Sequence, residues 1–66
     1  MEQTIEKYRY NLLNYKIAKE IFKNNELYNL CILRYELNLL KFTETHEDKY
    51  KIILDSLDGI LGFLVN

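Results

Sequence analysis

Apolar side chains recur along the chain at spacings of three and four residues, the repeat of an α-helix rather than of a β-strand. Proline is absent, and the good helix formers Leu, Lys and Glu are abundant. The pattern is broken at Asn24-Asn25 and across residues 43–47. We therefore predict one helical domain over residues 1–66, with helices at residues 4–23, 26–42 and 46–58, or 46–64 if the last helix continues.

Both breaks contain residues that favour helix ends. Asn tolerates left-handed backbone conformations and also caps helix starts, which suits Asn24 and Asn25 to a turn. Thr45 stands three residues before Asp48, the spacing of a capping box with Asp in place of Glu. Glu47 and Asp48 would then lie in the first turn, where the helix dipole favours negative charge. The sequence thus predicts that Thr45 caps the third helix.

The second predicted helix is apolar on all sides. Eleven of the sixteen residues from 27 to 42 are apolar, namely Leu27, Tyr28, Leu30, Cys31, Ile32, Leu33, Tyr35, Leu37, Leu39, Leu40 and Phe42. A helix that is apolar all round is buried in protein or in a membrane. The charges of Arg34, Glu36 and Lys41 argue against the membrane, so we expect this helix to be covered by protein.

A chain of 66 residues is too small to cover it fully. Such a chain buries only about 60% of the surface that its unfolded form exposes, and small folds need a disulfide, a metal or a partner subunit. Cys31 is the only cysteine and His46 the only histidine, which leaves association as the expected means of stabilisation. We predict an all-α fold, a three-helix bundle or a helical hairpin plus a third helix, completed by dimerisation. Its oligomer core would consist of Leu30, Leu33, Leu37 and Leu40.

The third helix has a conventional apolar face and a very apolar end, Gly59-Ile60-Leu61-Gly62-Phe63-Leu64-Val65. The glycines predict either a helix end near Gly59 or the close approach of another backbone. We expect the apolar end to be docked on the core or on another chain. The chain is also rich in tyrosine, a residue enriched at protein interfaces. Tyr28 and Tyr35 suit the edge of the core, and the candidate partner-binding residues are Tyr8, Tyr10, Tyr15, Ile60, Phe63 and Leu64.

Residues for catalysis are scarce. His46 has no Ser or Cys nucleophile near it in sequence, and the Asp55/Asp58 pair, three residues apart, is typical of a solvated helix edge. Cys31 lies among apolar residues and is expected to behave as a small hydrophobe. We therefore predict a protein without catalytic residues, cofactor or metal.

Nucleic-acid binding is the main alternative function. The first helix carries basic residues interleaved with tyrosines, a combination that can follow a phosphate backbone, and the candidates are Arg9, Lys16, Lys19 and Lys23. The net charge of −1 provides no global field toward nucleic acid or an anionic membrane. The composition therefore favours a protein that binds another protein.

The N-terminal residues carry charges where a signal peptide has an apolar core, and no apolar run approaches the length of a membrane span. With a lone cysteine, this predicts a cytoplasmic protein without a membrane span. The richness in Lys, Asn, Ile and Tyr is typical of a low-GC bacterium or its phages.

Residues 20–60 resemble the small helical antirepressors of Bacillus that bind the transition-state regulator AbrB. The resemblance rests on Tyr35-Glu36-Leu37-Asn38, a polar loop, Tyr50-Lys51 and Leu57-Asp58. Members of that family are helical dimers that occupy the DNA-binding surface of the regulator. The resemblance implies a cytoplasmic regulator or inhibitor that docks on a larger protein.

Residues 30–61 are also similar to the sporulation aspartyl-phosphate phosphatases, through Leu33-Arg34 and Leu57-Asp58. The characteristic Ser of that family corresponds to Leu54 here, so no catalytic role is carried over. A phosphatase-like protein is the second alternative function.

Overall fold

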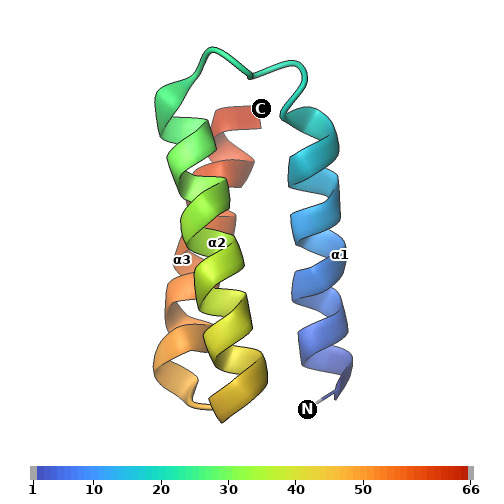
Figure 1. Cartoon of the computed structure of the whole chain (residues 1–66), viewed down its shortest axis with the longest axis vertical. Helices are drawn as coiled ribbons and strands as arrows, with labels where there is room; N and C mark the ends of the chain where they lie inside the picture. The colour runs from blue at the N-terminus through green and yellow to red at the C-terminus, as the bar shows by residue number, and fades with distance from the viewer. Residues whose placement is uncertain (1, 66) are drawn as a thin grey trace.

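The computed structural model describes residues 2–65 as three helices that run up, down and up (Figure 1). They are α1 (Glu2–Ala18), α2 (Glu26–Thr45) and α3 (Asp48–Val65). The bundle measures 33 × 17 × 17 Å, and no strand occurs among these residues. The predicted all-α three-helix fold is confirmed.

The first helix is shorter than predicted, ending at Ala18 instead of residue 23. Beyond it the chain forms tighter turns, in which the amide of Ile21 donates to the carbonyl of Ala18 and that of Asn25 to Phe22. The Phe22 ring packs against Tyr28, with centroids 5.0 Å apart. The Tyr28 hydroxyl donates to the Tyr15 carbonyl at 2.7 Å. These contacts with α2 outweigh the local helix propensity of residues 19–23.

The predicted turn at Asn24-Asn25 is confirmed, and Asn25 is the N-cap of α2. Its side-chain oxygen accepts a hydrogen bond from the backbone amide of Tyr28 at 3.0 Å. This bond satisfies one of the amides that the first turn of a helix leaves without a partner.

The prediction that Thr45 caps the third helix is wrong, because Thr45 is the last residue of α2. Its hydroxyl donates back to the Lys41 carbonyl and accepts from the Glu47 amide. His46 ends the helix in the left-handed region, with φ 58° and ψ 22°, and its amide donates to the Phe42 carbonyl. The sharp reversal leaves only residues 46 and 47 between α2 and α3.

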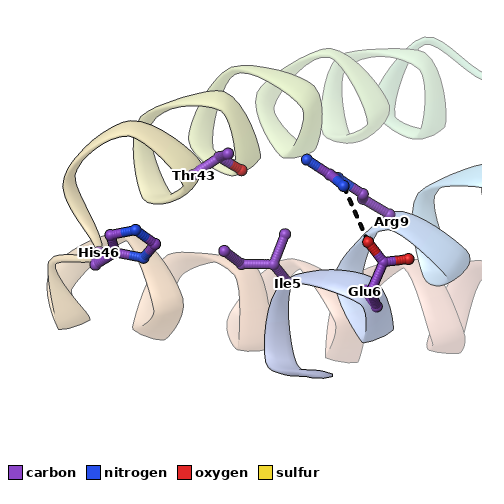
Figure 2. A pocket seen from close by; sticks show the side chains of 5 residues that line it. All are labelled: Ile5, Glu6, Arg9, Thr43 and His46. Atoms are coloured by element: carbon purple, nitrogen blue, oxygen red, sulfur yellow. Dashed lines mark hydrogen bonds and ion pairs between the residues drawn. The ribbon is translucent and has the colours of Figure 1, made fainter. Parts of the chain in front are cut away.

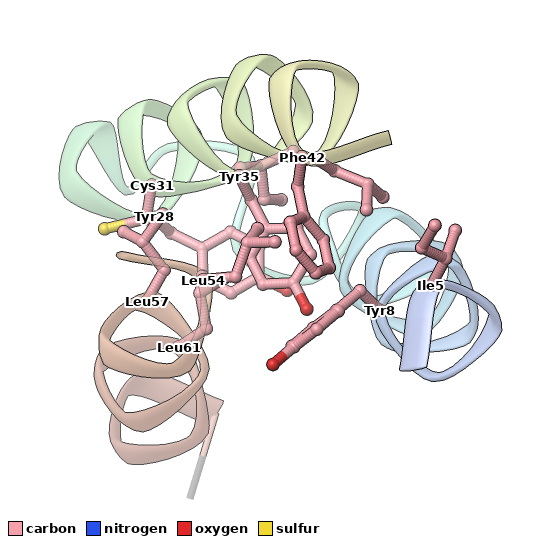
Figure 3. Packing of buried hydrophobic residues seen from close by; sticks show 11 residues of the cluster. Ile5, Tyr8, Tyr28, Cys31, Tyr35, Phe42, Leu54, Leu57 and Leu61 are labelled. Atoms are coloured by element: carbon pink, nitrogen blue, oxygen red, sulfur yellow. The ribbon is translucent and has the colours of Figure 1, made fainter. Parts of the chain in front are cut away.

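The core is unusually aromatic and centres on α2 (Figure 3). Tyr28, Tyr35 and Phe42 project inward from α2, and Tyr8 reaches in from α1. The rings meet edge to face, with Tyr8 6.0 Å from Phe42 and Tyr15 5.5 Å from Tyr35, a geometry that suits the aromatic quadrupole. Tyr28 and Tyr35 thus belong fully to the core, and Cys31 is buried there as expected.

α3 docks on this core through Leu54, Leu57 and Leu61 and continues through both glycines. Neither glycine ends the helix, because α3 continues to Val65. A Cβ at Gly59 or Gly62 would meet nothing within 4 Å, so neither glycine admits the close approach of another described part of the backbone. The apolar end is only partly docked, because Leu61 is fully buried whereas Phe63 is 82% exposed.

This difference predicts unequal effects of two nearby truncations. Leu61→Ala removes a fully buried side chain and is expected to lower the free energy of unfolding by about 2–5 kcal/mol. Phe63→Ala, the matched control, is expected to change it by less than about 1 kcal/mol, because that ring faces solvent. Urea unfolding followed by circular dichroism measures both values. Equal losses would mean that the end of α3 packs differently.

Candidate protein-interaction surface

The outer face of α2 carries a row of four leucines that the other described residues leave half-exposed. We call this row the α2 seam; it consists of Leu30, Leu33, Leu37 and Leu40. Each of these side chains is 48–56% exposed. Their spacing of three, four and three residues places them on one line, on the side of the helix opposite the buried Tyr35.

Charged and polar residues flank the α2 seam asymmetrically. Helical geometry places Arg34 and Lys41 along one edge and Asn29 and Glu36 along the other. Glu36 forms an ion pair with Lys16 of α1 at 2.9 Å. Neither Arg34 nor Lys41 forms an ion pair within residues 2–65. The α2 seam therefore has one edge with unused positive charge and one edge that carries a carboxylate.

A second exposed apolar surface lies on α1, on the side away from the core. This α1 outer face consists of Tyr10, Leu13 and Ile17, which are 56–66% exposed. The opposite side of the helix carries Ile5 and Tyr8, both buried. Tyr10 is one of the predicted partner-binding residues. Leu13 and Ile17 are not, although their spacing of four residues is typical of one face of a helix.

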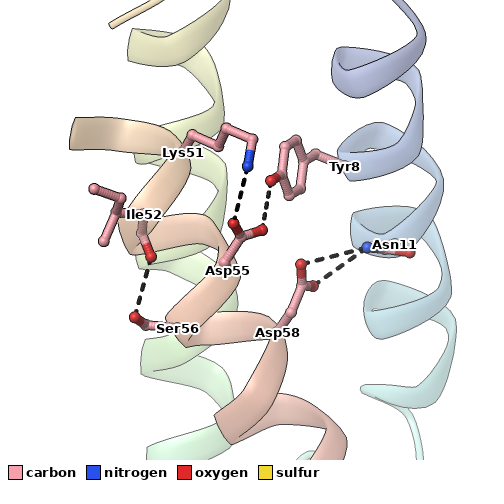
Figure 4. Close-up of polar contacts among 7 residues, drawn as sticks. All are labelled: Tyr8, Asn11, Lys51, Ile52, Asp55, Ser56 and Asp58. Carbon is pink, nitrogen blue, oxygen red and sulfur yellow. Dashed lines mark hydrogen bonds and ion pairs between the residues drawn. The ribbon is translucent and has the colours of Figure 1, made fainter. Parts of the chain in front are cut away.

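Between α1 and α3 the contact is polar (Figure 4). The hydroxyl of Tyr8 donates to the Asp55 carboxylate, and the hydroxyl of Tyr15 donates to Asp58 at 2.7 Å. The Asn11 amide lies 3.4 Å from both carboxylate oxygens of Asp58. Asp55 lies at a solvated helix edge as predicted and Asp58 is half-buried, but both carboxylates also hold α1 to α3, which the sequence did not predict.

These contacts perturb the titration of the groups that make them. Burial, followed by the hydrogen bond to Asp55, raises the pKa of Tyr8 above its ordinary value. Burial and the bond to Asp58 do the same to the pKa of Tyr15. Burial and then the charge of Asp58 raise the pKa of Tyr35, whose buried hydroxyl makes no hydrogen bond among the described residues. The bond from Tyr8, followed by the nearby Lys51, lowers the pKa of Asp55.

The structure separates the predicted partner-binding residues into two groups. Tyr10, Ile60 and Phe63 are exposed. Tyr8 is only 1% exposed, so its assignment as a partner-binding residue is wrong for this fold. Tyr15 and Leu64 pack against the core and are half-buried. Tyrosine content alone did not distinguish these cases, because Tyr8 and Tyr15 satisfy their hydroxyls inside the bundle.

The structure does not bring the basic candidates together on one helical face. Arg9 is paired with Glu6 at 2.9 Å, and Lys16 with Glu36. Lys19 and Lys23 lie in the turn that follows α1, not on the helix. The predicted basic face therefore does not continue past Ala18, and carboxylates neutralise its two helical members.

His46 lies at one end of the bundle, beside a shallow pocket between α1 and α2 (Figure 2). Ile5, Thr43 and the Arg9–Glu6 ion pair form the rest of the wall. Within residues 2–65, no three His, Cys, Asp or Glu side chains are grouped so that they could hold a metal ion. The pocket presents no nucleophile beside His46 apart from the Thr43 hydroxyl, which donates to the Leu39 carbonyl.

No protein-family model, curated protein or solved structure matches this chain. The resemblances to antirepressors and to phosphatases therefore stay predictions from short motifs. None of the three described helices combines the length and the hydropathy needed to cross a membrane.

The Tyr8–Asp55 bond predicts how stability depends on pH. The pKa of Asp55 is lower in the folded chain than its ordinary value of 3.8. The stabilisation is therefore present above that value and lost as the pH falls through the lower, folded-state pKa. Tyr8→Phe removes this bond and is expected to reduce the free energy of unfolding by about 1–2 kcal/mol at neutral pH. This is the usual contribution of a charge-assisted hydrogen bond, reduced because the Asp55 side chain is about half-exposed to solvent.

Urea unfolding at neutral pH and at about pH 2.5 measures this dependence. The difference between the wild-type chain and Tyr8→Phe should narrow as the pH falls toward the lowered folded-state pKa of Asp55. Tyr10→Phe is the control, because Tyr10 is exposed and makes no hydrogen bond among the described residues. A difference that stays constant between the two pH values would show that Tyr8 acts by packing alone.

Proposed function

We propose that this chain is a small helical protein-interaction module. It pairs with a second copy through the α2 seam and docks on a larger protein as a regulator or inhibitor. The observation that carries the proposal is the α2 seam itself, four half-exposed leucines in line on a helix whose other side is already fully used by the core. A contiguous apolar surface of this kind is typical of an interface.

The free energy gained by covering the seam is similar in size to the cost of association. Covering eight half-exposed leucines, four from each copy, is worth about 6–12 kcal/mol, taking half of the usual value for a full side chain. Association costs about 4–15 kcal/mol in lost freedom of motion. Because the two terms are similar in size, the seam leucines alone do not fix the affinity, and additional contacts at the edges of the seam decide it.

The α1 outer face is the proposed docking surface for the larger protein. It lies on a different helix from the α2 seam and therefore stays exposed when a second copy covers that seam. Residues Tyr10, Leu13 and Ile17 follow the spacing with which a helix enters an apolar groove on a partner. The resemblance to antirepressors supports a regulatory target for this surface.

The two alternative functions have less support. The nucleic-acid alternative relies on Arg9 and Lys16 of α1, and both are paired with carboxylates. The phosphatase alternative needs a free Asp58, which instead accepts hydrogen bonds from Tyr15 and Asn11.

A charge placed in the seam is expected to abolish self-association without unfolding the chain. Leu37→Asp puts a carboxylate at a half-exposed position, which a monomer tolerates but a covered interface does not. Ile52→Asp, on the exposed side of α3, is the matched control. Sedimentation equilibrium should give the mass of a dimer for the wild-type chain and for Ile52→Asp, and 8.0 kDa for Leu37→Asp. A monomeric wild-type chain at tens of micromolar would refute self-association.

Docking on a larger protein is tested on α1. A partner obtained by affinity purification is to be reconstituted from purified components, and its affinity measured by calorimetry. Ile17→Asp is expected to weaken binding at least about tenfold, the effect of burying an unpaired charge, while leaving the dimer intact. Phe63→Ala is the control on the far helix. If Ile17→Asp binds like the wild-type chain, the α1 outer face is not the docking surface.

A further inference from the structure

The charge pattern beside the α2 seam points to one arrangement of the dimer. We infer that two copies pair through α2 in parallel and in register, with Glu36 of each copy beside Lys41 of the other. This inference rests on the self-association proposed above and adds its direction and register.

The four seam leucines occupy all the inner positions of a coiled-coil repeat. Taking Leu30 and Leu37 as the a positions makes Leu33 and Leu40 the d positions. The pattern ends at both sides with a charged residue, Glu26 at the preceding d position and Glu44 at the following a position. The seam is therefore four leucines long, and the pairing helix is already folded by the rest of the bundle, so its ordering adds no cost on association.

The same repeat places the flanking charges at the positions that set orientation in coiled coils. Arg34 and Lys41 are e residues, and Asn29 and Glu36 are g residues. In a parallel pair each g residue lies beside the e residue five positions further along the other helix. Glu36 then meets Lys41 and Asn29 meets Arg34, each twice by symmetry.

An antiparallel pair centred on the seam gives the opposite result. It places e residues beside e residues and g residues beside g residues, so Arg34 faces Arg34 and Glu36 faces Glu36 of the second copy. Like charges at such positions destabilise a helix pair. The glutamates at the seam ends do not discriminate, because Glu26 and Glu44 meet another glutamate in either direction. The edge charges therefore select the parallel arrangement.

Within the chain, Glu36 already contacts Lys16. In the parallel pair it lies between two ammonium groups, Lys16 of its own copy and Lys41 of the other, so one carboxylate serves both the bundle and the interface. Lys41 has no carboxylate within ion-pair distance among residues 2–65, which leaves it free for this contact.

Disulfide cross-linking tests the direction. Leu40→Cys and Leu30→Cys are made separately in a Cys31→Ala chain, which is the control for cross-linking through the native thiol. In the parallel pair each variant meets its own copy, and each forms a disulfide dimer alone under mild oxidation. In the antiparallel pair the two Leu40 positions are about 15 Å apart along the axis, well beyond the roughly 7 Å that a disulfide spans. Only a mixture of the two variants would then cross-link.

A charge reversal tests the register independently. Glu36→Lys faces Lys41 in the parallel pair and is expected to raise the Kd of the dimer roughly tenfold. Adding Lys41→Glu restores the pairs with exchanged signs and should recover most of the affinity. Lys16→Gln is the control for the lost contact within the chain and should leave the dimer unchanged.

The outcomes are distinct. Self-cross-linking of Leu40→Cys together with rescue by the double reversal supports the parallel pair. Cross-linking only between Leu30→Cys and Leu40→Cys, or a dimer that Glu36→Lys does not weaken, overturns it while leaving self-association standing. If the chain is a dimer but neither cysteine variant cross-links, alone or mixed with the other, the dimer uses another surface. That result overturns both the parallel direction and the α2 seam as the interface. A wild-type monomer in sedimentation would refute the proposed self-association as well.

Discussion

The edge-to-face contact of aromatic rings between α1 and α2 is the interaction on which the rest of the fold depends. Tyr28, Tyr35 and Phe42 fill the inner side of α2, and Tyr8 meets two of them from α1. Large flat rings occupy much of the volume that three short helices can enclose. The tyrosines also carry hydroxyls. Those of Tyr8, Tyr15 and Tyr28 reach a polar partner, whereas the buried hydroxyl of Tyr35 makes no hydrogen bond among the described residues.

The positions of those partners explain the polar contacts around the core. The Tyr28 hydroxyl donates to the carbonyl of Tyr15, which lies in the last turn of α1 before that helix ends at Ala18. Tyr8 and Tyr15 reach Asp55 and Asp58, which fixes how α1 lies on α3. α1 is thus held to α3 through hydroxyl–carboxylate bonds, whereas α3 is held to α2 through leucines.

With much of the interior occupied by aromatic rings, the four leucines of the α2 seam are left on its outer face. Within residues 2–65, neither α1 nor α3 covers them. The apolar surplus lies in one line on a rigid helix of 20 residues, where it can serve an interface. The proposed function follows from this division, an aromatic side for folding and a leucine side for association.

The sequence predicted the elements that depend on local chemistry and missed those that depend on contacts between helices. Helix type, the Asn25 cap and the two apolar sides of α2 follow from spacing and residue type alone. The end of α1 at Ala18 depends on Tyr28 and Phe22, which pack across the turn. The roles of Asp55 and Asp58 depend on tyrosines more than forty residues away, which no local pattern reveals. The prediction that Thr45 caps the third helix failed because its hydroxyl bonds the Lys41 carbonyl and the Glu47 amide at the end of the preceding helix.

The central claim is that a second copy of this chain covers the outer face of α2. Isotope-filtered nuclear Overhauser spectroscopy on a mixture of ¹³C-labelled and unlabelled chains tests it directly, because only contacts between copies produce signals. The account predicts intermolecular contacts from the methyl groups of Leu33 and Leu37, and none from the buried methyls of Leu54 and Leu61. Intermolecular contacts confined to α1 or α3, or their complete absence in concentrated solution, would contradict it.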